Sequence, residues 1–273
     1  MKANSKVLLG ILCATVAGTA FSAIVTVPGT SDPWLAGMTN GATASSGDVS
    51  PAQSPAEVIG LPIVPGDLLI FTASGTEANH TNRTSYGSEG NTNNVLAHSA
   101  GAQNGISSCT APIDSLLGVF LRPDLPSLTS APAALDFTTQ AARDYTNLAP
   151  PLKQVFFIGN GVTSSGLTQT VVVPPGATRL FLGPMDGFHW YDNVGEFTVT
   201  VTSLLQLDIR PFDAWHVDIS WSTNAQNYSL EYATNMPAST WMPITNSPAV
   251  VGDKFVLRVS VALQQQFFRL QLP

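Results

Sequence analysis

The clearest candidate chemistry lies in the segment Asp186–Phe197. Asp186, Asp192 and Asn193 carry hard oxygen atoms and lie within eight residues of one another. Ca²⁺ binds roughly six to eight such oxygens, from carboxylates, amides, backbone carbonyls and water, and two carboxylates would balance its charge. Adjacent side chains on a regular strand point to opposite faces, so Asp192 and Asn193 can converge only in a loop. On spacing alone, the segment fits an ordinary hairpin loop rich in Asp, Asn and Gly as well as it fits a calcium-binding loop.

Three aromatic residues, Phe188, Trp190 and Tyr191, lie inside the same segment. Aromatic rings can pack against the C–H groups of a pyranose while nearby oxygen atoms contact its hydroxyl groups. The segment is thus a candidate sugar-binding site. The alternative for at least one of these rings is a place in the hydrophobic core.

The segment Thr178–Val199 resembles the calcium loop of the PA-I-like galactophilic lectins. In that family a strand, an Asp, a short loop, two adjacent Asn and a Gly-x-Phe-x-Val strand follow in this order. Pro65–Gly75 is similar to the first core strand of the family and the loop after it. The resemblance spans about residues 58–204, and it implies a galactose-binding-like β-sandwich that binds calcium and a galactoside or other glycan.

The resemblance also implies which residues bind the ion and the sugar. Asp186 matches the first carboxylate of the family, but it is one residue closer to the following pair. Asp192 and Asn193 match the paired amides, with a carboxylate replacing one amide. The remaining implied ligands are backbone carbonyls from His189 or Trp190 and from near Asn79 or His80. The implied sugar contacts are His98 and Gln103, for which the alternative is a solvated loop position, while Trp190 and Phe188 are sugar-contact candidates through their aromatic rings.

Enzymatic chemistry has little support in the sequence. The chain lacks the Gly-x-Ser-x-Gly, P-loop, His-Glu-x-x-His and Cys-x-x-Cys motifs. Asp186, Asp192 and Glu196 are spaced closely, as glycosidase carboxylates could be, but metal ligands cannot easily also serve as acid and base. His80 and His189 would form a transition-metal site only if their loops meet. We therefore expect a binding protein and not an enzyme.

The composition is that of a secreted β protein rich in turns. Charged residues make up only 11% of the chain, against about 25% in an ordinary soluble domain, while Gly and Pro are frequent. The net charge of −7 becomes −9 when Lys2 and Lys6 are subtracted (−7 − 2). An acidic surface repels phosphate backbones, which argues against a nucleic-acid partner.

The N-terminus has the pattern of a signal peptide. Lys2 and Lys6 precede an apolar run and small residues that end in Phe21-Ser22-Ala23, which predicts a signal over residues 1–23 with cleavage near Ala23. No second apolar stretch is long enough to span a membrane. We therefore expect a mature protein that is secreted or held at the cell surface.

The remaining chain divides into two predicted domains. Residues 24–57 are expected to be an irregular lead-in, and residues 58–204 a β-sandwich with a long loop over 74–112 and a helical patch near 137–148. Near 204–206 the pattern changes to about seven short strands, which predicts a smaller immunoglobulin- or fibronectin III-like sandwich over 205–273. The first domain has strand patterns at 68–73, 115–121, 153–158, 167–173, 179–182 and 195–204.

The leading hypothesis is a calcium-dependent carbohydrate-binding protein of bacterial type. One alternative is a structural or adhesive surface protein in which calcium only stabilises a loop. Another is a non-catalytic accessory of a polysaccharide-degrading system. A homo-oligomer is compatible with each of them. Cys109 would be the lone cysteine after signal cleavage and is expected to be buried as a small hydrophobe.

Overall fold

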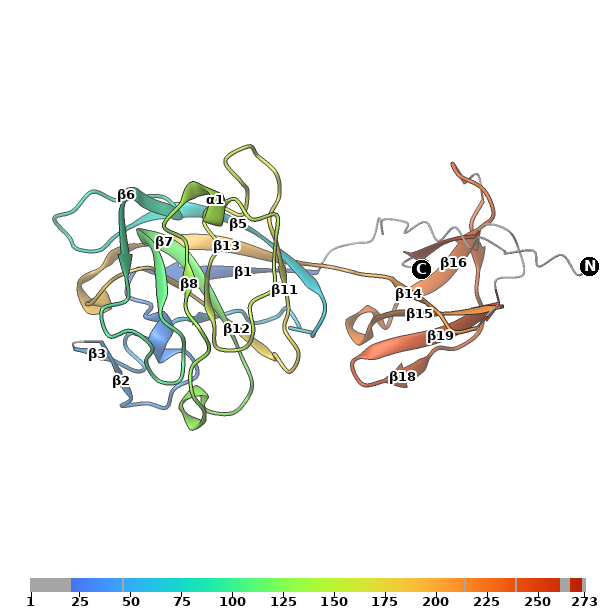
Figure 1. The fold of residues 1–273 in the computed structure, drawn as a ribbon, viewed down its shortest axis with the longest axis horizontal. Coiled ribbons are helices and arrows are strands. Elements are labelled where there is room, and N and C mark those ends of the chain that lie inside the picture. Colours follow the sequence, from blue (N-terminus) through green and yellow to red (C-terminus); the bar gives the residue numbers. More distant parts are fainter. Residues whose placement is uncertain (1–20, 46, 214, 239, 261–265, 272–273) are drawn as a thin grey trace, which may run out of the picture. The chain divides into compact units, whose positions relative to one another are not determined.

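The chain forms two compact units, which meet in the sequence between Leu204 and Leu205. The computed structural model describes residues 21–273 except 46, 214, 239, 261–265 and 272–273, so the predicted signal peptide falls mainly outside the described residues. Strands in several sheets dominate both units, which confirms the predicted all-β class (Figure 1). The sequence pattern changes at the same position as the division between the units.

The first domain contains a five-stranded sheet whose strands alternate between buried and exposed residues. The alternation is clear in its edge strand, where Ala23, Val25 and Val27 are buried and Ile24 is exposed. The strands, in spatial order, are β1 (Phe21–Pro28), β13 (Val194–Leu204), β5 (Leu68–Ala78), β11 (Thr170–Val172) and β9 (Asn147–Leu148). Residues 24–57 therefore do not form a wholly irregular lead-in, because β1 pairs with β13 along its full length.

A second sheet packs against the first, and buried residues of both sheets form one hydrophobic core. Its central strand, β7 (Cys109–Leu121), is buried along almost its whole length, as expected of a strand covered on both faces. Its other members are β10 (Val155–Phe157), β12 (Arg179–Pro184), β4 (Ala56–Glu57), β6 (Glu89–Ala97) and β8 (Leu135–Asp136). A separate short hairpin contains β2 (Thr43–Ala44) and β3 (Asp48–Val49).

Two expectations for this domain were wrong. The region 74–112 is not one long loop, since β5 continues to Ala78, β6 occupies Glu89–Ala97 and β7 begins at Cys109. The helix expected near 137–148 is only one turn, α1 (Gln140–Arg143), capped by the Thr139 side chain. Helix nucleation is costly, and β8 and β9 take the flanking residues into sheets instead. Cys109 is buried and unpaired, as predicted.

The described residues of the second domain form seven strands, close to the positions that the sequence predicts. One sheet has the order β14-β15-β19-β18 and the other the order β17-β16-β20. The first order corresponds to the A-B-E-D sheet of an immunoglobulin constant-type sandwich. The strands are β14 (Asp208–Pro211), β15 (His216–Ser222), β16 (Ser229–Ala233), β17 (Met242–Pro243), β18 (Ala249–Val251), β19 (Lys254–Ser260) and β20 (Phe267–Gln271).

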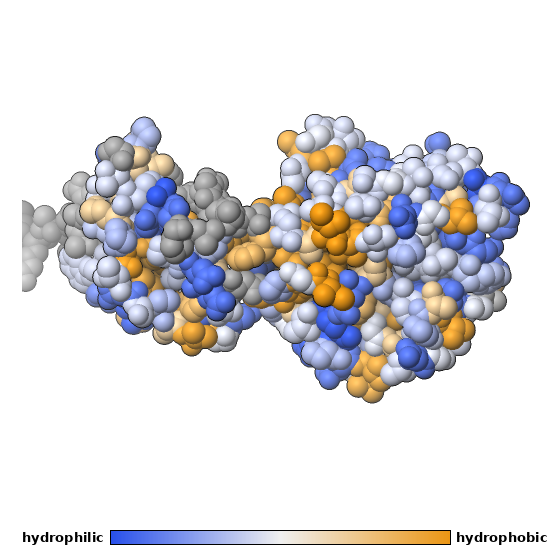
Figure 2. Space-filling model, turned by 180° about the vertical axis from the view of Figure 1, so that it is seen from behind, coloured by the Kyte–Doolittle hydropathy of each residue, from blue (hydrophilic) through white to orange (hydrophobic). Residues whose placement is uncertain are grey.

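The surface is largely polar, with separate apolar areas on the face shown in Figure 2. Among the described residues, no helix is long and apolar enough to cross a membrane. The single-turn 3₁₀ segments of the first domain are η1 (Pro33–Leu35), η2 (Pro126–Leu128) and η3 (Trp190–Asp192), and η4 (Thr223–Ala225) belongs to the second domain. The segment η3 lies inside the predicted calcium loop.

Candidate functional site

Two of the three predicted side-chain ligands meet inside the first domain. Asp186 and Asn193 lie at the two ends of the loop between β12 and β13, and both are buried. The Asp186 Oδ1 atom accepts backbone hydrogen bonds from Gly187 at 2.5 Å and Phe188 at 3.3 Å. The Asn193 side chain also donates to Asp186, and its Nδ2 atom donates to the carbonyl of Gly29 at 3.1 Å. The Asn193 Oδ1 atom is buried without a hydrogen-bond partner, so it is available as a ligand.

A glycine with a left-handed backbone positions this loop against β5. Gly195 follows Asn193 after one residue and has a φ of 87°. A Cβ atom at this position would lie 2.3 Å from the carbonyl oxygen of Thr76, so only glycine fits without displacing the backbone. The close approach brings the loop alongside the end of β5.

The third predicted ligand, Asp192, lies beside the loop that follows β5. Its Oδ2 atom is 3.9 Å from Nε2 of His80, and its side chain is partly exposed. The charge of Asp192 also raises the pKa of Asp186. The loop carrying Asn79 and His80 therefore approaches the predicted site. The Trp190 carbonyl, an expected ligand, accepts the backbone N–H of Asn193 at 3.2 Å.

Asp48 is a part of the site that the sequence analysis missed. It lies in β3, within the predicted lead-in, and its side chain is bound to η3. Its Oδ1 atom accepts from the Tyr191 N–H at 3.0 Å, and its Oδ2 atom accepts from the Trp190 N–H at 3.3 Å. Burial raises the pKa of Asp48, and these two hydrogen bonds oppose the rise. Asp48 thus fixes η3 from a distant part of the sequence.

Glu77 and Asp114 are two further buried carboxyl groups that the sequence analysis did not select. Glu77 is 0% exposed, and neither of its carboxylate oxygens has a hydrogen-bond donor. Asp114 is also buried, and its carboxylate accepts the backbone N–H of Asn79. Burial raises the pKa of both groups, and each interacts with the other and with Asp186. No local signal in the sequence marks them, because Glu77 lies in the segment expected to be a loop and Asp114 lies just before the strand expected at 115–121.

Six carboxyl groups form an acidic group, which makes one end of the first domain strongly acidic. Among the described residues, no Lys or Arg forms an ion pair with them. Burial is the largest cause of the raised pKa of Asp186, which is about 6. Burial also raises the pKa of Asp32 well above its ordinary value, and Asp48 and Asp186 add to the rise. The group contains Asp32, Asp48, Glu77, Asp114, Asp186 and Asp192.

The arrangement limits how a metal ion could be held. Within the described part of the chain, no three His, Cys, Asp or Glu side chains are grouped closely enough to hold a metal ion. A cation would therefore take at most two carboxylates from one position. Amide oxygens, backbone carbonyls and water would complete its shell, which is a combination that Ca²⁺ accepts.

The structure corrects the predicted role of Trp190 as a sugar contact. Trp190 is 0% exposed, its Nε1 atom donates to the Pro184 carbonyl at 2.9 Å, and its ring packs at 5.4 Å from the ring of Trp34. It belongs to the core, because the indole ring points inward from η3. Phe188 and Tyr191 are 47% and 48% exposed, and the ring of His189 lies between them, at 3.9 Å and 5.1 Å. These three rings form the exposed aromatic surface of the loop.

The predicted sugar-binding roles of His98 and Gln103 are also wrong or unsupported. His98 is buried and stacks on Trp34 with ring centroids 3.7 Å apart. Its Nδ1 atom bonds the Gly101 carbonyl at 2.7 Å, and burial lowers its pKa to about 4, so it is a neutral core residue at neutral pH. The Oε1 atom of Gln103 accepts the backbone N–H of Ser45 at 2.9 Å, which fixes the β2–β3 hairpin.

A polar cavity of about 260 Å³ lies next to the acidic group. Asp114 is one of its lining residues, and a second, shallower cavity over His80 and Asn82 shares Asn79 and Arg83 with it. Amide and hydroxyl groups can donate to or accept from sugar hydroxyls, and a guanidinium group can donate to them. The cavity is lined by Asn79, Arg83, Thr84, Tyr86, Asn91, Asn94, Ile113 and Asp114.

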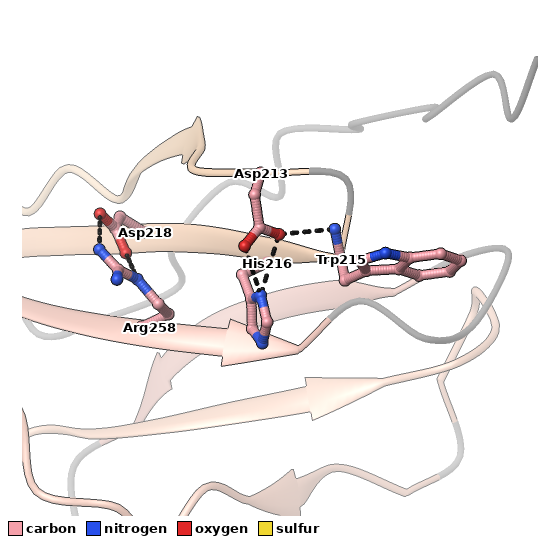
Figure 3. A network of polar contacts seen from close by, with 5 residues as sticks. All are labelled: Asp213, Trp215, His216, Asp218 and Arg258. Atoms are coloured by element: carbon pink, nitrogen blue, oxygen red, sulfur yellow. Dashed lines mark hydrogen bonds and ion pairs between the residues drawn. The ribbon is translucent and has the colours of Figure 1, made fainter.

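The second domain has a polar network of a different kind (Figure 3). The Asp213 carboxylate accepts the Trp215 backbone N–H at 2.7 Å and lies 2.9 Å from Nδ1 of His216, so it stabilises the turn between β14 and β15. Asp218 and Arg258 form a two-point ion pair across β15 and β19. These groups are exposed or half-buried, and their contacts stabilise the turn and the pairing of β15 with β19. The network therefore has a structural role.

The geometry thus concentrates the candidate binding chemistry in the first domain, at the end that carries the β12–β13 loop. Comparison of the chain with family models, with curated proteins and with solved structures finds no match.

Proposed function

We propose that the first domain is a calcium-dependent carbohydrate-binding module of a secreted bacterial protein. The observation that carries the proposal is the meeting of Asp186 and Asn193, with the buried Asn193 Oδ1 atom left without a partner. Such an oxygen is costly to bury unless a donor or a cation reaches it. The surrounding carboxyl groups lack Lys or Arg partners among the described residues, which favours a divalent cation.

The surface around this loop supports a carbohydrate partner. Phe188 and Tyr191 expose ring faces on which a pyranose can stack. The cavity that Asp114 lines offers amide groups from Asn79, Asn91 and Asn94 for sugar hydroxyls. Its volume, about 260 Å³, is below the roughly 300–1,000 Å³ of pockets for drug-sized ligands. It therefore suits a single sugar residue.

One observation favours the alternative in which the cation is purely structural. Asp186 and Asn193 are only 6% and 5% exposed. A sugar hydroxyl can bridge to a bound cation only if one coordination position faces solvent. If no position does, the cation would order the loop, and the aromatic surface and the cavity alone would contact the sugar.

A glycan array probed with and without calcium tests the proposal. We expect binding in millimolar calcium and its loss in EDTA. Asp186→Asn should weaken calcium binding by roughly 10- to 100-fold or more, because even outer-shell partners of metal sites have effects of that size. Asp136→Asn is the control, because Asp136 is an exposed carboxylate in β8 that does not belong to the acidic group. Unchanged glycan binding in EDTA would exclude a calcium-dependent mechanism, and calcium binding without any glycan would favour the structural alternative.

The start of β1 refines the expected site of signal cleavage. Cleavage after Ala23 would remove Phe21, Ser22 and Ala23, all of which pair with β13. It would also place the large Phe21 three residues before the cut, where signal peptidases need a small residue. Cleavage after Ala20 leaves β1 whole and has Gly18 and Ala20 at the small positions. We expect the exported protein to begin at Phe21 by intact mass spectrometry, and a start at Ile24 would contradict this.

A further inference from the structure

We propose that Glu77 and Asp114 bind a divalent cation, with Ca²⁺ the best match. This inference concerns two carboxyl groups behind the loop that carries Asp186 and Asn193. It concerns cation binding only, so it holds whether or not the domain binds a glycan.

Glu77 is placed in the interior by the pairing of its own backbone. Its N–H and C=O groups exchange hydrogen bonds with Tyr86 at 2.9 and 2.7 Å, and it lies opposite Gly195 on β13. Its side chain passes close to Gly29, where a Cβ atom would lie only 3.0 Å from the Glu77 Cγ atom. The Gly29 carbonyl in turn accepts the Asn193 amide. The Glu77 and Asn193 side chains therefore both lie next to Gly29, and Glu77 is fully buried with two oxygen atoms that no donor reaches.

Asp114 reaches the same place from the second sheet. It has a left-handed backbone, with φ of 67°, within the long strand β7. Its N–H donates to the carbonyl of Met185 at 2.7 Å, next to Asp186. Its carboxylate accepts the Asn79 N–H, and its Oδ1 atom remains buried without a partner. Non-glycine residues adopt this conformation at a cost, and such strain is common at functional sites.

A cation explains this pair better than a proton does. Two carboxylates side by side can share one proton, but that proton removes only one negative charge. Asp186 adds a third carboxyl group close enough to interact with both. A divalent ion balances the Glu77 and Asp114 charges together, and isolated charges are very costly to bury. Both ligands are hard oxygens, which favours Ca²⁺ or Mg²⁺.

Calcium suits the site better than magnesium does. Mg²⁺ requires a near-octahedral shell and usually keeps several waters, whereas Ca²⁺ accepts irregular shells of carboxylate and amide oxygens. The Asn193 Oδ1 atom is a candidate for a further ligand, because it is buried without a partner and both Asn193 and Glu77 lie next to Gly29. The pair would then extend the β12–β13 loop site inward.

Calorimetry of calcium binding to the full chain tests this inference. We expect Glu77→Gln and Asp114→Asn each to reduce calcium affinity by at least about tenfold, or to remove one binding step. Asp67→Asn is the matched control, since Asp67 is equally buried in the segment leading into β5, beside Ser203 near the opposite end of the β5–β13 pair. It should leave calcium binding unchanged. Equal affinity and stoichiometry in the wild type, Glu77→Gln and Asp114→Asn would overturn the inference, as would the absence of calcium binding by the wild type.

Thermal unfolding gives a second readout that separates a ligand from a merely structural residue. In EDTA, Glu77→Gln should unfold at a higher temperature than the wild type, because it lacks a buried ionisable group. In calcium, the wild type should unfold at a higher temperature than Glu77→Gln. A variant less stable than the wild type by the same amount in both buffers would overturn the inference. Glycan binding that fails while Glu77-dependent calcium binding persists would refute the proposed function alone.

Discussion

Trp190→Ala is expected to lower the free energy of unfolding of the first domain by about 3–5 kcal/mol. The indole ring is fully buried and packs against Trp34 and His98, so its removal leaves a cavity in the core. The substitution also leaves the buried Pro184 carbonyl without the Nε1 donor. Denaturant unfolding, followed through the transition of the first domain, measures the change. The loss of any glycan binding by this variant would follow from unfolding.

Tyr191→Ala is the control, one residue along the same 3₁₀ turn. Its side chain is 48% exposed, so the substitution should change stability by about 1 kcal/mol or less. It should instead weaken glycan binding by roughly 2- to 10-fold through lost stacking, the equivalent of about 0.5–1.5 kcal/mol. A stable Trp190→Ala variant with selectively reduced glycan binding would contradict the core assignment and restore Trp190 as a sugar contact.

The strand pattern of the sequence predicted much of the fold because burial alternates clearly along many strands. Phe197, Val199 and Val201 face the core while the intervening threonines do not. The strand predicted over 195–204 is β13, which spans Val194–Leu204. The second domain shows the same effect. Turn residues separate its seven short strands, and each strand appears close to its expected position.

The prediction failed where long-range pairing decides the structure. Two segments lack a simple apolar alternation: the end of β5, with Thr76 and Glu77, and the polar strand β6. Their sequences therefore resemble loops, and they become strands because β5 pairs with β13 and β6 pairs with β7. β-strand preference depends strongly on such context. The edge strand β1 was missed for a related reason, because it begins inside the segment assigned to the signal peptide.

The candidate site was predictable only where its residues are close in sequence. Asp186, Asp192 and Asn193 share one loop, and their spacing identified them. Glu77 and Asp114 come from different sheets, and nothing in their local sequence indicates that the two carboxyl groups meet. The exposure of an aromatic ring is equally a tertiary property. Sequence alone could not decide which of Trp190 and Tyr191 would turn inward from η3.

The cation-free protein is expected to lose stability as the pH rises, and calcium should remove this loss. Burial raises the pKa of Glu77, Asp114 and Asp186, so the folded state binds more protons than the unfolded state does above their ordinary values. Stability is then highest in acid and falls as the pH passes through the ordinary pKa and up to the folded one. His98 has the opposite sign, since burial lowers its pKa to about 4, but between pH 6.5 and 8 it adds only about 0.4 kcal/mol and it is nearly constant above about pH 7.5.

The window from pH 6.5 to 8 therefore isolates the carboxyl groups whose pKa is raised furthest, chiefly Glu77. One extra bound proton changes the free energy of unfolding by about 1.4 kcal/mol per pH unit, or about 2 kcal/mol across this window. In EDTA the unfolding temperature of the first domain should fall by roughly 4–8 °C, measured by scanning calorimetry. In calcium it should stay level, because the bound ion replaces the protons. Glu77→Gln in EDTA should also show a level profile, since its side chain has no proton to lose. A stability in EDTA that rises or stays constant over this window in the wild type would mean that these carboxyl groups are ionised and stabilised without a cation.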